Sequence, residues 1–583
     1  MKKYIENQLF CCIIFIKIKM EVDNVLKTVF SFILTMILLV TNLISSNIPG
    51  NVPEPEDVEN LAALTEPFEV KPLAEEIVVI KSSVLTRGER CVIASLQGLV
   101  GRTEASIFID YGYDSKTELA DLEAAGCTIL YTDENGEAWN FEKVINRFRS
   151  HIRDDGYILF GDHNTDEQLN MGFNYSTVYG WLAVPADAEE RVKALGLEKK
   201  EDISDDKITV KFQRDFYEEH KDLFNKKVLI HQYAKASGLF DLAVQQNIFI
   251  FFADEETPDE VAFRNQIYRD LEPASMILGW CNREVAHVEA AARYGHYVIP
   301  SDHSFNMSVL TCNRIDNPPM SDKVEAPELD PDKHYVAIVY SDGDNAQWIS
   351  NGFSEYYTWQ SYNIDTPITW TFAPQMNLFS STAVKKAIEN NNGDSFITGP
   401  SGAGYARIDH MSVKEVEKYS KVTAATMEKS GLRIMTLLND VPSNAYADWV
   451  YANKLECFAR YDNIDGGIIQ MDNDYYAGGH GRVYFVNDKP FISVRVSLWH
   501  PSGDPSQVTK EWLKEQADIV NNSDADINSI NGYSVINVHP WTVGPDDLAY
   551  FVSCLDENVE VISAAELVAA VEKNVPHKST KVK

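Results

Sequence analysis

The fold is decided by one stretch of the chain, YVAIVYSDGDN at residues 335–345. Its first six residues are apolar or aromatic and lack the alternation of a half-exposed strand, which is typical of a strand buried on both faces of a parallel sheet. The run then breaks into a short polar turn that holds Asp342 and Asp344. Because loops after parallel strands converge on one edge, this stretch predicts an α/β fold with reactive groups at the carboxyl edge of the sheet.

Further short runs rich in Val, Ile, Phe or Tyr follow along the same half of the chain, at residues 368–373, 396–398, 434–438, 468–471, 491–496, 534–538 and 559–562. Helical patterns lie between several of them, including 381–390, 413–429, 509–521 and 545–555. Eight β/α steps fit the size of a (β/α)8 barrel. We therefore predict a (β/α)8-like, TIM-like catalytic domain over residues 326–575. The alternative is an open, doubly wound sheet.

The preceding region, residues 76–325, predicts a separate N-terminal α/β domain. Strand-like and helix-like patterns alternate along it, with strand-like runs at 77–80, 106–111, 128–131, 157–161, 227–231, 248–252 and 276–280. Proline-rich breaks at 317–319 and 325–331 separate this region from the C-terminal half. Such breaks are typical of a domain boundary, because no apolar run crosses them.

The first 75 residues differ from the rest of the chain. An apolar run at 29–44 follows Lys27 and precedes two small serines, which is the order of a secretory signal, so residues 1–46 are expected to be a signal peptide or a membrane anchor. Residues 47–75 contain several prolines among acidic residues and predict a spacer. The expected location is secreted or at the cell surface of a bacterium, with membrane contact only through an uncleaved N-terminal segment.

The composition excludes some function classes. The chain has 52 Lys+Arg against 87 Asp+Glu, a formal net charge of −35, so it repels phosphate backbones and nucleic-acid binding is not expected. A neutral carbohydrate needs no electrostatic steering and remains compatible. The cysteines after the N-terminal segment have neither CxxC nor metal-ligand spacing, so no cofactor is expected and a metal is left open. They are Cys91, Cys127, Cys281, Cys312, Cys457 and Cys554.

Carboxylates follow three of the predicted C-terminal strands. The candidates for catalysis are Asp342, Asp344, Asp440, Asp472 and Asp474. A turn can be built from Gly, Pro or Ser, so acids at several strand ends favour a site. The plain alternative for the first pair is a turn in which aspartates cap the next helix. An EF-hand calcium loop is disfavoured, since the twelfth position from Asp342 is Phe353 rather than Glu.

Other polar and aromatic residues follow the same strands and are candidates for substrate binding. They are Asn345, Gln375, Tyr405, Asn439, Trp499, His500, His539 and Trp541. Apolar sugar faces pack on indole rings, while sugar hydroxyls need amide or carboxylate partners. Structural roles stay open for the histidines, each of which precedes a proline, and for Tyr405 in its glycine-rich turn.

The turn at Gly402-Ala403-Gly404-Tyr405, together with the strand that ends at 342–345, resembles the GxGYxYP family of glycoside hydrolases. Segments 95–102, 301–302 and 306–310 are similar to that family's N-terminal domain, so the resemblance covers about residues 75–565. It implies an exported bacterial protein that acts on polysaccharides. The match departs from the motif at Arg407 and Ile408, where the family has Tyr and Pro.

Three functions are consistent with these residues. The first is a glycoside hydrolase in which one carboxyl group protonates the leaving oxygen and another acts as nucleophile or base. The second is a metal-dependent carbohydrate deacetylase using the aspartates after the first strand and His539, although no two histidines have HxxxH spacing. The third is a glycan-binding surface protein without catalysis.

Overall fold

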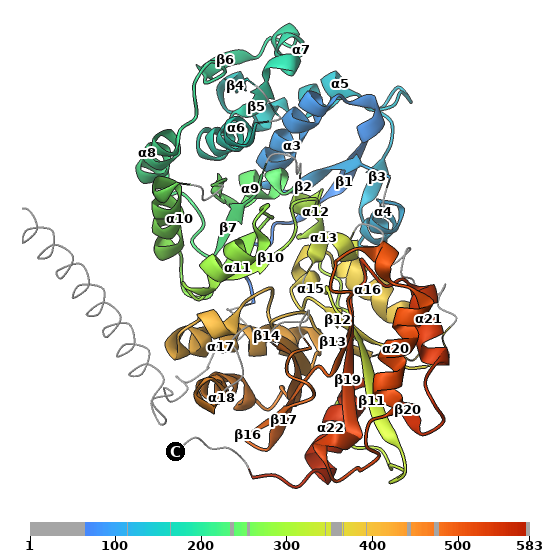
Figure 1. The fold of residues 1–583 in the computed structure, drawn as a ribbon. Helices are drawn as coiled ribbons and strands as arrows, with labels where there is room; N and C mark the ends of the chain where they lie inside the picture. The colour runs from blue at the N-terminus through green and yellow to red at the C-terminus, as the bar shows by residue number, and fades with distance from the viewer. Residues whose placement is uncertain are drawn as a thin grey trace, which may run out of the picture.

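The computed structural model describes residues 65–112, 115–161, 163, 165–233, 238–253, 257–343, 345–350, 364, 366–391, 393, 395–439, 445–471 and 477–578. In Figure 1 the blue-to-green elements form an upper half and the yellow-to-red elements a lower half. No helix in these ranges is long and apolar enough to cross a membrane. The expected signal or anchor, residues 1–46, lies outside the described residues.

The described residues of the upper half form three small sheets, ordered β2-β1-β3, β5-β4-β6 and β10-β9-β7-β8, and all their strand pairs are parallel. Their strands are β1 Leu73–Lys81, β2 Ala105–Asp110, β3 Thr128–Leu130, β4 Gly156–Phe160, β5 Leu182–Pro185, β6 Glu198–Asp202, β7 Val228–His231, β8 Ile250–Phe251, β9 Met276–Leu278 and β10 Tyr297–Ile299. The helices are α3 Arg87–Gly101, α4 Ser115–Ala124, α5 Phe141–Arg147, α6 Asp166–Tyr179, α7 Glu189–Ala194, α8 Val210–His220, α9 Phe240–Gln246, α10 Pro258–Asp270, α11 Glu284–Ala292 and α12 Met307–Leu310. The α/β class with parallel sheets is confirmed.

A buried amide and a partly buried guanidinium group connect helices, a strand and a loop of the upper half. Gln97 of α3 donates Nε2–H to the carbonyl of Ile107, at 2.9 Å, and to Oδ1 of Asn306, at 2.8 Å. Arg102, which follows α3, donates Nε–H to the carbonyl of Val244 at 2.9 Å. Buried polar groups require such partners. Segments 95–102 and 306–310 therefore have a structural role in the upper half.

The lower half contains two sheets, ordered β13-β12-β11-β19-β18, with β20 also paired to β11, and β14-β15-β17-β16. Their strands are β11 His334–Tyr340, β12 Thr369–Phe372, β13 Ser395–Thr398, β14 Ile434–Asn439, β15 Gly466–Met471, β16 Val483–Val486, β17 Lys489–Ser493, β18 Val496–Leu498, β19 Tyr533–Val538 and β20 Val559–Val561. The helices are α13 Ala346–Trp348, α15 Met376–Phe379, α16 Ser381–Glu389, α17 Val413–Ser430, α18 Ala445–Ala459, α20 Lys510–Asn521, α21 Pro545–Ser553 and α22 Ala564–Asn574. All pairs are parallel except β16 with β17.

A closed (β/α)8 barrel is not confirmed, because the described strands form two open sheets. The single strand predicted over 491–496 is in fact two strands that belong to different sheets. Val494 donates its N–H to Ile469 of β15, whereas Arg495 donates its N–H to Val535 of β19, both at 2.9 Å. Neighbouring residues thus pair with different sheets. Pro400, which follows β13, pairs with Thr436 of β14 through an isolated bridge rather than a ladder.

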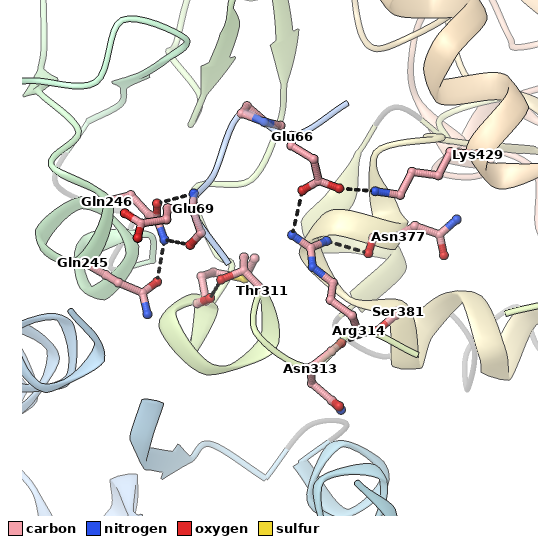
Figure 2. A network of polar contacts seen from close by, with 12 residues as sticks. Glu66, Glu69, Gln245, Gln246, Thr311, Asn313, Arg314, Asn377, Ser381 and Lys429 are labelled. Carbon is pink, nitrogen blue, oxygen red and sulfur yellow. Dashed lines mark hydrogen bonds and ion pairs between the residues drawn. The ribbon is translucent and has the colours of Figure 1, made fainter. Parts of the chain in front are cut away.

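A polar network joins the two halves near the start of the described chain (Figure 2). Glu66 pairs with Lys429 of α17 and, at 3.8 Å, with Arg314. Arg314 also donates Nη1–H to the carbonyl of Asn377 in α15, at 3.0 Å. Exposed ion pairs contribute little free energy to stability. The main effect of this network is therefore to fix how the segments around Glu66 and Arg314 pack on the lower half.

Candidate active site

A cavity of about 370 Å³ lies between the two halves of the molecule. The upper half supplies Trp280, Glu284 and Pro300 to its wall. The lower half supplies Ser341, Asp342, Asn345, Gln347, Pro400, Tyr405, Leu438, Gln470, Trp499, Asn537, His539 and Trp541. Its volume is in the range of pockets that bind small molecules or parts of larger ones.

Asp342 reaches this cavity through an unusual backbone conformation at the end of β11. Its φ angle is 145°, a region that non-glycine residues rarely adopt and that clusters at functional sites. The N–H groups of Asp342 and Gly343 both donate to Oγ1 of Thr371, at 3.2 and 2.9 Å, and this hydroxyl donates to the carbonyl of Tyr340. A Cβ on Gly343 would lie 2.0 Å from the Thr371 carbonyl oxygen, so only glycine fits there.

The carboxyl group of Asp342 is poised to carry a proton near neutral pH. Burial raises its pKa to about 7, and the hydrogen bond from Trp541 opposes part of this rise while Glu284 adds to it. That hydrogen bond runs from Nε1 of Trp541 to Oδ2 of Asp342 at 2.5 Å. A carboxyl group with a pKa near the working pH can act as a general acid.

The GxGY turn joins the halves next to this carboxyl group. Tyr405 and Val298 exchange both backbone hydrogen bonds, at 2.8 and 2.9 Å, so the turn pairs with β10 of the upper half. A Cβ on Gly404 would lie 2.6 Å from Cδ1 of Ile299 and 2.7 Å from Cδ2 of Tyr297. The second glycine of the motif therefore permits the close approach of the two halves.

Glu284 is the second carboxyl group in the cavity, and it comes from the other half of the molecule. It is the first residue of α11, and its Oε1 accepts a hydrogen bond from the Tyr405 hydroxyl at 2.9 Å. The ring of Tyr405 stacks on Trp280, with ring centres 6.1 Å apart and planes at 22°. The motif tyrosine thus orients a carboxyl group that lies far away in the sequence.

Aromatic rings form another wall of the cavity. Trp499 stacks face to face on His539, with ring centres 3.7 Å apart and planes at 2°. The ring centres of Trp541 and Trp348 are 5.5 Å apart. Trp541 is 52% exposed, so part of its indole face is open to a ligand. Burial lowers the pKa of His539 to about 4, which keeps this imidazole neutral at neutral pH.

Amide groups line the base of the cavity between the strands. Gln470 of β15 donates Nε2–H to the Ser341 hydroxyl at 2.6 Å and to Oδ1 of Asn537, in β19, at 3.1 Å. All three are buried or nearly so. They connect the two lower sheets beneath the cavity and offer hydrogen-bonding groups to a polar ligand.

Six residues predicted for the site line the cavity. They are Asp342, Asn345, Tyr405, Trp499, His539 and Trp541. The Oδ1 atom of Asn345 also accepts the Trp348 N–H at 3.1 Å, so this side chain caps α13. Four predicted catalytic residues, Asp344, Asp440, Asp472 and Asp474, lie outside the described residues.

Three predicted substrate-binding residues are not part of the cavity wall. Gln375 is buried and donates Nε2–H to the Tyr297 hydroxyl at 3.0 Å, so it joins the two halves instead. Asn439 is buried at the end of β14. His500 contacts Ser502 and the ring of Trp512 and does not line the cavity.

Sequence reasoning missed the residues that reach the cavity from the upper half and from strand interiors. Trp280 and Glu284 follow β9 in the upper half, whereas all the predicted site residues follow strands of the C-terminal half. Gln470 and Asn537 each interrupt an apolar strand just before its carboxyl end. An amide residue within an apolar strand, just before its carboxyl end, was the sequence feature that could have predicted these two cavity residues.

These features define a class of protein, an α/β protein with a cavity between two halves that is lined by carboxyl, amide and aromatic groups. The family model described as GxGYxYP putative glycoside hydrolase C-terminal domain matches residues 332–572. The model of the GxGYxYP third domain matches residues 226–312. The chain belongs to the GxGYxYP family, as its motif indicated.

One solved structure has the same fold. It is the crystal structure of a putative hydrolase from Bacteroides thetaiotaomicron VPI-5482, with a TM-score of 0.74 and 23% sequence identity. The similarity covers 90% of this chain and 99% of that one. At this identity the likeness establishes the fold alone. No curated protein matches the chain.

Proposed function

We propose that the protein is a glycoside hydrolase that cleaves a poly- or oligosaccharide in the cavity between its halves. One observation carries the proposal: Asp342 of the lower half and Glu284 of the upper half line the same cavity and influence each other electrostatically. Cleavage of an acetal requires two such carboxyl groups, one on each side of the bond. The family name and the fold support the same class of reaction.

Asp342 is the general acid in this proposal. With a pKa of about 7, it still carries its proton in about half of the molecules at pH 7 and can give that proton to the leaving oxygen. The hydrogen bond from Trp541 holds the carboxyl group in place and stabilises the carboxylate that forms on proton transfer. The value of kcat/KM should then fall as the pH rises through about 7.

Glu284 is the second carboxyl group, as nucleophile or as the base that activates water. The Tyr405 hydroxyl donates to one of its oxygens, which fixes the position of the carboxyl group. The other oxygen has no such bond from Tyr405 and can face the sugar. An acid and a base held by different partners is the arrangement that this reaction needs.

The sugar is held by the aromatic and amide walls. The exposed face of Trp541 suits the apolar face of a pyranose ring, and Gln470 and Asn537 suit its hydroxyl groups. The strongly acidic chain favours a neutral glycan over an anionic one.

We also propose that the two lower sheets act as one barrel-like scaffold. Residues at the carboxyl ends of β11, β14, β15, β18 and β19 all line the same cavity. This convergence is the functional property of a (β/α)8 barrel, whether or not the strands close.

The experiment compares Asp342→Asn and Glu284→Gln with the wild type on a panel of neutral glycans, by release of reducing ends. Each variant is expected to lose at least roughly a hundredfold in kcat. Glu289→Gln, on the same helix, and Asp332→Asn, before β11, are matched controls that should retain activity. Full activity in both site variants would disprove the carboxyl pair, and acetyl release without cleavage would identify a deacetylase instead.

We propose, finally, that the chain is exported, because the apolar run at 29–44 follows a basic residue and precedes small ones. Fractionation of the native organism with mass spectrometry of the N-terminus tests this: a secreted or surface-bound protein is expected, and a cytoplasmic protein with an intact N-terminus would contradict it.

A further inference from the structure

Two imidazole rings and a thiol meet in the upper half, behind the wall of the cavity. His231 ends β7, Cys281 lies between β9 and α11, and His287 lies within α11. All three are buried, and one ligand atom from each lies within 4.8 Å of the others. The two imidazole rings are 4.7 Å apart. The fold brings together three residues that the sequence separates.

Three of the four imidazole nitrogens in this cluster lack the partners that buried polar atoms normally have. Nε2 of His231 and both ring nitrogens of His287 have no partner with hydrogen-bond geometry among the described residues, whereas Nδ1 of His231 contacts the Tyr268 hydroxyl. Leaving such atoms unpaired in a protein interior costs free energy. An imidazole nitrogen without a proton carries the lone pair that a metal ion needs.

We propose that His231, Cys281 and His287 bind a Zn²⁺ ion. Imidazole nitrogen and thiolate sulfur are the ligands that zinc prefers, and three protein ligands leave one tetrahedral position for another group. Ligand atoms around zinc lie roughly 3.5 Å apart, so the side chains must close by about 1 Å on binding. The Tyr268 hydroxyl contacts Nδ1 of His231 at 3.2 Å, so Nε2 is the nitrogen that remains to bind a metal.

The charge balance makes the thiolate essential. The Arg264 guanidinium lies over the ring of Tyr268, 6.0 Å from its centre, and the Tyr268 hydroxyl contacts His231, so this positive charge opposes a cation bound nearby. Ionised Cys281 would supply a negative charge that offsets this repulsion, with its proton released to solvent. Loss of the thiol should therefore weaken binding more than the loss of a neutral ligand would.

A bound metal would hold in place the segment from Trp280 to His287, which supplies two residues to the cavity wall. His287 lies one turn after Glu284 on α11, and its ring contacts Trp280 edge to face at 6.1 Å. Trp280 and Glu284 both line the cavity. Zinc binding itself does not depend on the proposed function; only its effect on catalysis does.

The experiment measures metal content in the full chain after dialysis against zinc, by plasma mass spectrometry, and the absorption spectrum after exchange for Co²⁺. The wild type is expected to hold about one zinc per chain and to show a thiolate-to-cobalt charge-transfer band. Cys281→Ser and His287→Gln are expected to weaken zinc binding at least roughly tenfold and to abolish or shift the band.

Matched controls replace buried residues outside the cluster. His296→Gln and Cys312→Ser should keep the zinc and the cobalt band, with folding checked by circular dichroism. A folded wild type that holds no zinc and shows no thiolate-to-cobalt band would overturn the proposal. So would zinc binding that survives in folded Cys281→Ser and His287→Gln proteins. If a variant does not fold, the wild-type cobalt spectrum alone decides.

Discussion

Asp342 combines three features that are typical of a functional residue. They are a positive φ angle, a carboxyl group whose pKa is raised by burial, and a hydrogen bond from Trp541. Its φ of 145° is held by Thr371, which accepts both N–H groups of the turn. Burial of an acidic side chain without a cation beside it costs free energy once the group ionises. Residues of this kind are expected where activity, rather than folding, determines the residue type.

The titration of Asp342 predicts a pH-dependent stability. Its pKa is about 7 in the folded chain against an ordinary 3.8, so the folded state holds the proton more tightly than the unfolded state. Stability from this proton is complete below about pH 4 and is lost as the pH rises through 7. Relative to Asp342→Asn, the wild type should lose up to roughly 4 kcal/mol between pH 4 and pH 8.

Urea unfolding of both proteins across this pH range checks the titration. The variant should be the more stable protein at pH 8 although it is inactive. A stability difference between the two proteins that does not change with pH would show that Asp342 has an ordinary pKa.

The Tyr405 hydroxyl is predicted to act on catalysis through Glu284. Tyr405→Phe keeps the ring on Trp280 and removes the hydroxyl that donates to the Glu284 carboxyl group. We expect kcat to fall roughly 10- to 100-fold and its pH profile to shift, while the melting temperature changes by only a few degrees. Tyr297→Phe, which removes another buried hydroxyl at the junction of the halves, is the control. Equal losses of kcat in both variants would mean that Tyr405 has only a packing role.

At the scale of elements, the GxGY turn both connects the two halves of the molecule and contributes Tyr405 to the candidate active site. It pairs with β10 in the upper half, and it presents Tyr405 to a residue of α11. The two residues at which this chain departs from the motif, Arg407 and Ile408, are both buried after the turn. Gly404 and Tyr405, which match the motif, make the contact between the halves.

Gly404 is predicted to be intolerant of any side chain. Gly404→Ala places a Cβ 2.6 Å from Ile299 and must push the turn away from β10, which should cost roughly 1–3 kcal/mol and lower kcat. Thermal unfolding and activity assays measure both effects. Gly544→Ala is the matched control, because there the nearest atom is 3.8 Å away and the backbone is ordinary. Similar melting temperatures for both variants would contradict the junction role.

Much of the lower half could be predicted from the sequence, because buried parallel strands are short, apolar and followed by polar turns. All eight strand positions predicted there contain strands. The exchange of sheets between Val494 and Arg495 could not be predicted, since both residues continue one extended run. In the upper half, β5, β6 and β10 were missed, because they lacked a strong apolar run or lay between helical patterns.

At the scale of the whole molecule, the candidate site belongs to neither half alone. Asp342, Trp499 and Trp541 could be predicted because each follows a strand of the lower half. Glu284 could not, since its approach to Asp342 depends on how the halves pack, and packing between halves leaves no periodic signal in the sequence. The zinc cluster has the same origin, as its ligands come from β7, α11 and the segment before α11.

The central claim is that one carboxyl group from each half acts on the same bound sugar. A crystal structure of Asp342→Asn with a bound oligosaccharide that the wild type cleaves tests this most directly. We predict that the scissile oxygen lies within hydrogen-bonding distance of residue 342, that Glu284 faces the same sugar unit, and that Trp541 packs on a neighbouring ring. A sugar bound away from Glu284, or flanked by two carboxyl groups of the lower half, would contradict the account.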